Sequence, residues 1–188
     1  MNILLTGHRG FIGSALHSRL LKSGHKVHGM DIVANGLDNL LYCDFPADDF
    51  DLIIHLAGKS GVRESLQDPA AYWNNNVEAS RRLFERYEGT RILYASSSSA
   101  YEPDLNPYAA SKFLIEELAE RYEPAKMLGM RFHTVYSDSC PRENMFFNKL
   151  RNGTLKYVTR HHRDFIHLED ILDANEILMR NPQVCGHI

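Results

Sequence analysis

The sequence predicts an α/β fold of the Rossmann type, a doubly wound parallel sheet with a small, reduced C-terminal substrate lobe. Three observations favour it: short apolar runs alternate with helical patterns, a glycine-rich turn follows the first run, and one later run is apolar enough to be buried on both faces. The 188 residues suffice for one such domain with an appendage. We expect a Rossmann domain at residues 1–135 and an interleaved appendage at residues 136–188.

Hydrophobic patterning assigns the elements in chain order. Residues 1–5 form an apolar run that stops at Thr6, and residues 11–21 repeat apolar side chains at helical spacing before Gly24. Short apolar runs predict further strands at residues 26–31, 41–44, 51–56, 91–95 and 126–132. Helices are expected at residues 69–87 and 108–122. Later, where the alternation breaks, the sequence predicts a helix at 144–150, a strand at 155–158 and a helix at 168–179.

Composition argues against several classes of function. The net charge of −3 comes without a basic stripe, so we expect no nucleic-acid partner. The sequence has no run of about 18 apolar residues and enters a strand at once, which predicts no membrane span, no signal peptide and a cytoplasmic location. Cys43, Cys140 and Cys185 lack paired spacing, and the histidines form no helical pair, so we expect neither disulfides nor a metal site.

A glycine-rich turn links the first strand to the first helix. Gly7, Gly10 and Gly13 have G-x-x-G-x-x-G spacing, which lets backbone N–H groups and a helix N-terminus receive a pyrophosphate. Asp31 ends the next strand, where a carboxylate accepts hydrogen bonds from a ribose diol and repels a 2′-phosphate. Arg9 argues mildly for the phosphorylated cofactor. The balance predicts NAD, with NADP as the alternative.

Hydroxyl groups and a lysine follow the fifth expected strand. Residues 96–99 are four serines at the strand end, and Tyr108 lies one helical turn before Lys112. A phenol beside an ammonium and a positive nicotinamide favours its phenolate form, so Tyr108 is the candidate base. Ser97 is placed to hold the reacting hydroxyl. The alternative is that the serines only cap backbone groups at a turn.

Together these residues resemble the extended short-chain dehydrogenase/reductase family, the NAD-dependent nucleotide-sugar epimerases and dehydratases. The resemblance covers nearly the whole chain. The matching stretches are Thr6 to Gly13, Asp31, Asp44-Phe45, His55 to Gly58, Pro69 to Val77, Ser96 to Tyr101, Tyr108 to Lys112, Arg131 to Tyr136 and Arg163 to Asp170.

The resemblance implies a mechanism and a set of site residues. Tyr108 would take a sugar hydroxyl proton, hydride would pass to NAD, and hydride would return to a keto intermediate without net redox change. The implied catalytic residues are Ser97, Tyr108 and Lys112. The implied cofactor-binding residues are Gly7, Gly10, Phe11, Ile12, Gly13, Asp31, Asp44, Phe45, Leu56, Ala57, Gly58, Asn75, Tyr108 and Lys112, with Asp44 and Phe45 facing the adenine. The implied substrate-binding residues are Ser98, Thr134, Arg142 and Arg163.

Within this family, residues 61–65, 131–136 and 141–145 resemble those of uronic-acid 4-epimerases. Arg142 could pair with a C6 carboxylate or be a solvated loop residue. The resemblance implies that a sugar dehydratase of this family needs an Asp-Glu pair directly after the catalytic hydroxyl residue. This chain has Ser98 and Ser99 at those positions, so water elimination is disfavoured. UDP-glucose 4-epimerase, an NADP-linked keto-sugar epimerase/reductase, a sugar dehydratase of the same family, and a catalytically reduced NAD sensor or scaffold remain alternatives.

The substrate side is shorter than the resemblance leads one to expect. Ten residues separate Ser97 from Tyr108, the stretch from Tyr136 to Arg163 is abbreviated, and the sequence stops where a further strand is expected to begin. The chain is then either naturally compact or truncated, and its sugar pocket either open or completed by a second subunit. The helices that begin near Pro69 and Tyr108 correspond to those of a four-helix dimer interface, so a homodimer is expected.

Overall fold

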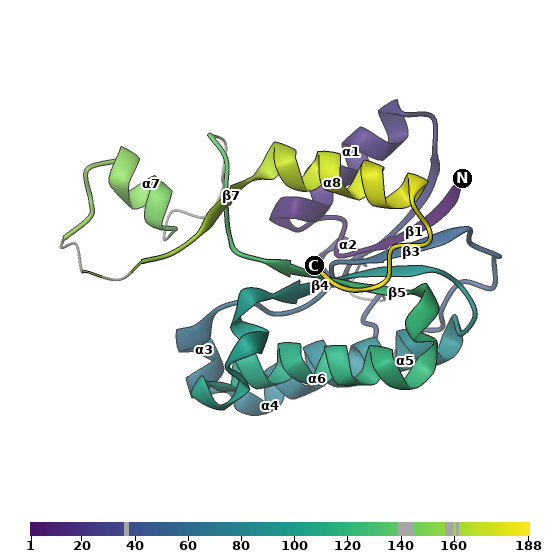
Figure 1. Cartoon of the computed structure of the whole chain (residues 1–188), viewed down its shortest axis with the longest axis horizontal. Coiled ribbons are helices and arrows are strands. Elements are labelled where there is room, and N and C mark those ends of the chain that lie inside the picture. The colour runs from purple at the N-terminus through teal and green to yellow at the C-terminus, as the bar shows by residue number, and fades with distance from the viewer. Residues whose placement is uncertain (36–37, 139–144, 157–159, 161) are drawn as a thin grey trace.

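A parallel sheet of six strands forms the centre of the molecule, which confirms the predicted fold class (Figure 1). The computed structural model describes residues 1–35, 38–138, 145–156, 160 and 162–188. The strand order is β2-β1-β3-β4-β5-β8, and every pairing is parallel. The strands are β1 Asn2–Thr6, β2 Lys26–Met30, β3 Leu52–His55, β4 Ile92–Ser97, β5 Met127–Phe132 and β8 Gly186–His187.

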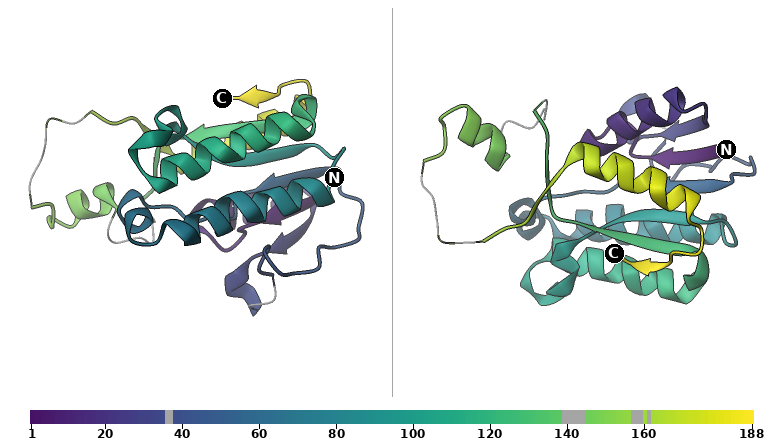
Figure 2. Two further views of the ribbon diagram at one scale, coloured as in Figure 1. Left: turned by 90° about the horizontal axis from the view of Figure 1, so that it is seen from below. Right: turned by 45° about the horizontal axis from the view of Figure 1, so that its top comes forward.

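Helices cover both faces of this sheet (Figures 1 and 2). Helices α1 (Phe11–Lys22) and α8 (Leu168–Arg180) lie on one face, and α5 (Ala79–Arg86) and α6 (Pro107–Tyr122) lie on the other. Successive strand residues point to opposite faces. Ile3 and Leu5 therefore join the core under α1 and α8, while Leu4 joins the core under α5 and α6.

The helix predicted at residues 69–87 is present, with a change of geometry in its middle. It consists of α4 (Pro69–Tyr72), a π-helical segment (Trp73–Glu78) and α5. Asp68 caps its start by accepting a hydrogen bond from the Ala71 N–H at 3.1 Å. Helix α6 begins in the same way, because Asn106 accepts from the Ala109 N–H at 2.9 Å and Pro107 occupies the first helical position.

The strand predicted at residues 41–44 is wrong, since this segment begins as a turn. The Asn39 carbonyl accepts hydrogen bonds from the Tyr42 and Cys43 N–H groups, both at 2.8 Å, and the Asn39 side chain accepts from Leu41 N–H at 3.1 Å. An asparagine that bonds to the following backbone favours a turn over a strand. Of the strand predicted at 155–158, residues 155 and 156 do not lie in a strand, and the other two lie outside the described residues.

Several short elements were not predicted. They are α2 Ile32–Asn35, α3 Val62–Gln67, β6 Thr134–Tyr136, β7 Phe165–His167 and β8. Strands β6 and β7 pair in parallel as a separate two-stranded sheet, and α7 (Phe146–Arg151) lies beyond them, away from the main sheet (Figure 1). The Tyr136 and Phe147 rings stack there with centroids 4.3 Å apart.

The chain after residue 136 contributes to both parts of the molecule. It supplies α7 and β7 to the small lobe and then returns with α8 and β8, whose partners are α1 and β5. The division at residue 135 stays a prediction. Within the described part of the chain, no helix is long and apolar enough to cross a membrane, and no group of three metal-ligating side chains comes together.

Strand β8 fits against β5 because Gly129 has no side chain. A Cβ at Gly129 would lie 2.7 Å from both His187 Cδ2 and the Tyr94 hydroxyl oxygen. We expect Gly129→Ala to lower the free energy of unfolding by about 1–3 kcal/mol and to accelerate hydrogen exchange of the Ile188 N–H, which donates to the Gly129 carbonyl. The volume-conserving control Met127→Leu on the same strand should leave that exchange unchanged. Wild-type protection of Ile188 in Gly129→Ala would contradict this packing.

Candidate functional site

A cleft of about 1220 Å³ opens at the carboxyl ends of the parallel strands, the edge of an open α/β sheet where ligands bind. The structure brings most of the predicted site residues to its wall. These are Gly7, Gly10, Phe11, Ile12, Gly13, Asp31, Leu56, Ala57, Gly58, Asn75, Ser97, Ser98, Tyr108, Lys112, Thr134 and Arg163. Arg142 lies outside the described residues.

The described residues that line the cleft do not include Asp44 or Phe45. The Phe45 ring instead packs against Tyr87, with centroids 5.9 Å apart, and the Arg82 guanidinium lies 5.4 Å from its centroid. Residues 38–40 form the cleft wall there.

The glycine loop lies directly against the segment that follows β3. Gly7 has a positive φ of 74°, and a Cβ on it would lie 2.6 Å from Ala57 N. A Cβ on Gly13 would lie 2.0 Å from the Gly7 carbonyl oxygen. Helix α1 then begins at Phe11 with no side-chain cap from any described residue. Its first N–H groups therefore face the cleft as donors for an anion such as a pyrophosphate.

Asp31 follows β2 and is nearly buried, with 9% of its surface exposed. Its carboxylate accepts hydrogen bonds from the Arg9 and Val33 N–H groups, both at 2.9 Å. Asp38 also lines this end of the cleft. Two carboxylates at one end of a binding site suit a ribose diol and oppose a second phosphate.

Ser97, Tyr108 and Lys112 reach the cleft from two elements that meet there. Ser97 is the last residue of β4, and its hydroxyl accepts from the Ser99 N–H at 3.2 Å. Tyr108 and Lys112 lie one turn apart at the start of α6. The Lys112 ammonium donates to the Ala95 carbonyl at 2.8 Å. The hydroxyl, phenol and ammonium thus come from the ends of neighbouring elements.

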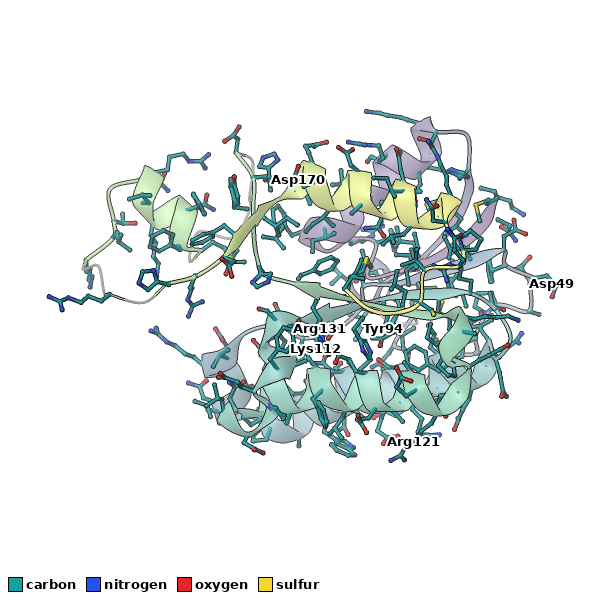
Figure 3. The ribbon with its side chains drawn as sticks, in the orientation of Figure 1. Asp49, Tyr94, Lys112, Arg121, Arg131 and Asp170 are labelled. Carbon is teal, nitrogen blue, oxygen red and sulfur yellow. The ribbon has the colours of Figure 1, made fainter. Side chains whose placement is uncertain are left out.

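Lys112, labelled in Figure 3, is almost completely enclosed, with 6% of its surface exposed. Burial lowers the pKa of its ammonium to about 8, while the charge of Glu116 acts in the opposite direction. At neutral pH the group is therefore a buried cation one turn from the Tyr108 phenol.

Asn76, which sequence reasoning missed, links the segment after β3 to α6 by hydrogen bonds. Its side-chain N–H₂ donates to the Ser111 hydroxyl at 2.9 Å and to the Lys59 carbonyl at 3.0 Å, and its oxygen accepts from the Lys59 N–H at 2.7 Å. The Ser111 hydroxyl in turn donates to the Tyr108 carbonyl at 2.8 Å. The run of asparagines at 74–76 within a helical pattern was the available signal. These residues lie in the π-helical segment, a geometry common at functional sites.

A buried histidine extends this network to the glycine loop. The two His55 ring nitrogens hydrogen-bond with the Thr6 hydroxyl at 2.7 Å and the Ser80 hydroxyl at 2.9 Å, and Ser80 donates to the Asn76 carbonyl. Burial, reinforced by the charge of Lys112, lowers the pKa of the His55 imidazole to about 3. His55 is therefore neutral at physiological pH and acts as a structural link between β1, β3 and α5.

Burial of Lys112 leads to a testable effect on stability. Its ordinary pKa is 10.5 and its pKa in the fold is about 8, a difference that corresponds to a cost on the order of 3 kcal/mol at pH 7. Lys112→Met also loses the hydrogen bond to Ala95, so we expect a net gain in unfolding free energy of about 1–2 kcal/mol.

This gain should shrink as pH rises from 8 towards 10.5. In that window the unfolded wild-type chain keeps the lysine proton and the folded chain has lost it, so wild-type stability rises with pH. Chemical denaturation at a series of pH values measures the difference. The exposed Lys22→Met is the control and should show no such trend. A Lys112→Met variant that is less stable than wild type at every pH would contradict this prediction, because it would show that burial of the ammonium does not lower the free energy of unfolding.

Comparisons with known proteins agree with this geometry. A profile of the NAD dependent epimerase/dehydratase family matches residues 3–187. Protein CapI of Staphylococcus aureus is 28% identical over 235 aligned residues, which cover 97% of this chain and 70% of CapI. UDP-glucuronate 4-epimerase 1 of Arabidopsis thaliana is 27% identical, with 92% of this chain and 53% of that protein aligned. The CapI alignment is longer than this chain of 188 residues, so CapI carries segments that this chain lacks.

Solved structures lead to the same family. MoeE5 in complex with UDP-glucose and NAD is 29% identical and superposes with a TM-score of 0.81. MoeE5 in complex with UDP-glucuronic acid and NAD superposes with a TM-score of 0.79. Each match covers 100% of this chain and 74% of the MoeE5 chain. Because the family profile extends from β1 to β8, this chain belongs to the NAD dependent epimerase/dehydratase family of enzymes.

Proposed function

We propose that this chain is an NAD-dependent epimerase of a nucleotide-activated sugar, acting at C4 of a UDP-hexuronate or UDP-hexose. One observation carries the proposal: Ser97, Tyr108 and Lys112 line the same cleft as the glycine loop and Asp31. A proton acceptor and a dinucleotide-binding loop therefore share one cavity. Epimerisation through a keto sugar needs both, because one centre must lose a hydroxyl proton and a hydride together.

The residues present fit a bound dinucleotide. Gly7 and Gly13 let the loop pack against the segment after β3 and against itself, and the open N-terminus of α1 faces the cleft. Asp31 is oriented for a ribose diol, which favours NAD over NADP. When bound, the nicotinamide supplies a reversible hydride acceptor. Segment 56–58, Asn75 and the start of α6 would contact the rest of the cofactor, as the wall of the cleft is formed there.

The chain's own residues then handle the proton. Tyr108 would accept the proton of the sugar hydroxyl, because the buried Lys112 cation lies one turn away on the same helix and favours the phenolate. The Ser97 hydroxyl would hydrogen-bond the reacting oxygen. Returning the proton from Tyr108 after the keto sugar has turned over completes the cycle without net oxidation.

Two observations support the proposed substrate class: further residues that line the cleft, and the ligands of similar solved structures. Ser98, Thr134 and Arg163 line the cleft, and Arg163 is an exposed cation suited to phosphate groups. The MoeE5 structures contain UDP-glucose and UDP-glucuronic acid. Ser98 and Ser99, in place of an acid pair, disfavour a dehydratase.

The test is to incubate the purified chain with NAD and, in turn, UDP-glucuronate, UDP-galacturonate, UDP-glucose and UDP-galactose, and to identify products by NMR. We expect a 4-epimer from at least one sugar, with NADP supporting less turnover than NAD. Tyr108→Phe should lower kcat by at least about a hundredfold while NAD affinity is retained. The matched control is Tyr122→Phe at the end of the same helix, which removes a hydroxyl that donates to Glu85 of α5.

Unchanged sugars in the presence of bound NAD would count against the epimerase and favour the sensor or scaffold alternative. Product formation at the wild-type rate by Tyr108→Phe would remove Tyr108 from the role of base.

We also propose that the chain forms a homodimer through the outer face of α4 and α6. An apolar groove of about 350 Å³ lies there, lined by Pro69, Ala70, Trp73, Pro107, Ala110, Ser111 and Leu114. Trp73 is 47% exposed beside it. Light scattering should give twice the 21.5 kDa chain mass, and Trp73→Glu should give a monomer, whereas Leu21→Glu on α1 should not. A wild-type monomer at micromolar concentration would refute the dimer.

A further inference from the structure

An ion pair with a buried carboxylate lies on the same face of α6 as Tyr108 and Lys112. Glu116 is 3% exposed. One of its carboxylate oxygens accepts from Arg131 Nε at 2.9 Å, and the other accepts from Arg131 Nη2 at 2.7 Å. The Ser96 hydroxyl donates to the first of these oxygens at 2.5 Å. One carboxylate on a helix is thus tied to two neighbouring strands.

The anchored positions are those next to the proposed catalytic groups. Glu116 lies one helical turn after Lys112, and Ser96 immediately precedes Ser97. Ser96 and Arg131 are direct partners in the pairing of β4 with β5. The carboxylate therefore ties the penultimate residues of both strands to α6 beside the cleft.

Arg131 also contacts the segment that follows Ser97. Its guanidinium carbon lies 4.4 Å from the centroid of the Tyr101 ring. Tyr101 closes the 3₁₀ turn Ser98–Tyr101 and lines the cleft although 66% of its surface is exposed. A cation over an aromatic ring attracts it, so this contact orients the turn that carries Ser98.

The pair is a poor device for stability alone. The Arg131 side chain is 22% exposed, but the Glu116 carboxylate is out of water. Burying a charge costs about as much as its attraction to a partner returns, and apolar side chains of similar volume often stabilise a fold as well or better. What an ion pair with fixed hydrogen bonds adds is a defined geometry. Burial alone would raise the pKa of the Glu116 carboxyl, but the hydrogen bonds from Arg131 and Ser96 lower it overall, so the group is a carboxylate at neutral pH.

The charged and titratable groups around this pair are few among the described residues. Glu116 faces Arg131 of β5, His187 of β8, Lys112 of α6 and Tyr94 of β4, and Tyr94 also feels Glu120. Lys112 faces Glu116 and the neutral His55 of β3. Of these neighbours of Lys112, Glu116 supplies the negative charge.

We propose that Glu116, held by Arg131, is a positioning residue that sets Ser97 against Tyr108 and Lys112 and keeps Lys112 in its ammonium form. This inference rests on the proposed function for its catalytic consequence. Its effect on Lys112 is a property of the folded chain and is measurable without any substrate.

The first experiment follows the titration of Lys112 by NMR in protein with isotope-labelled lysine side chains. The signal is assigned by its absence in Lys112→Met. In Glu116→Gln the loss of the negative charge should move the midpoint of this titration to lower pH, because the ammonium is then less favoured. An unchanged midpoint would overturn the electrostatic part of the proposal, whether or not the protein turns over any sugar.

The second experiment removes both partners at once. The double variant Glu116→Leu with Arg131→Met replaces the ion pair with apolar groups and should keep its thermal stability. We expect its kcat to fall at least tenfold with KM for the sugar nucleotide within twofold of wild type, and the alkaline limb of its pH profile to move to lower pH. Should Glu116→Gln fail to fold, the same lysine titration is measured in this double variant.

The control is Arg19→Met, which breaks the surface ion pairs of Arg19 with Glu169 and Asp173 far from α6. It should change neither the lysine titration nor the pH profile. A folded double variant with wild-type kcat and an unshifted profile would overturn the positioning role. If wild type epimerises no sugar while the Lys112 midpoint shifts as expected, the proposed function fails and the electrostatic coupling stands.

Discussion

The close approach of the glycine loop to the segment after β3 is the constraint on which the rest of the site depends. Gly7 lies where a Cβ would be 2.6 Å from Ala57 N, and Gly13 where it would be 2.0 Å from the Gly7 carbonyl. Only glycine at these two positions lets the backbone turn sharply enough for α1 to start at the edge of the sheet. The open N-terminus of α1, the segment after β3, the end of β4 and the start of α6 then line one cleft.

Buried polar groups connect the elements that line the cleft. His55 and Asn76 connect the glycine loop to the backbone of Tyr108, and Glu116 connects α6 to the ends of β4 and β5. Polar groups out of water are tolerated when their hydrogen bonds are satisfied, and such networks rigidify the elements that they join. The enclosed Lys112 ammonium is the exception, because burial opposes its charge. Burial of this charge lowers the stability of the fold, as is common where a functional site requires a buried charged group.

The small lobe is built differently. Strands β6 and β7 and helix α7 form a small lobe whose contacts are largely aromatic, among Tyr136, Phe147 and Phe165. The lobe stands away from the main sheet in both figures that show the ribbon alone. Its chain returns through α8, which packs on α1 and carries Arg19's acidic partners. The lobe is therefore tied to the dinucleotide-binding half at its base.

The sequence by itself determined the alternation of strands and helices, the glycine loop, Asp31 and the spacing of Tyr108 and Lys112. These are local signals, since hydrophobic period, turn chemistry and one-turn spacing are properties of short segments. Tertiary structure decided the rest. It formed a turn after Asn39 where the sequence predicts a strand, and it packed Phe45 against Tyr87. It also brought Asn76, His55, Glu116 and Arg131 to partners that are distant in sequence. Three-residue strands such as β6 and β7 are stable only when paired, so no local pattern marks them. Which polar residue a fold buries against which partner depends on contacts that exist only once the sheet has assembled.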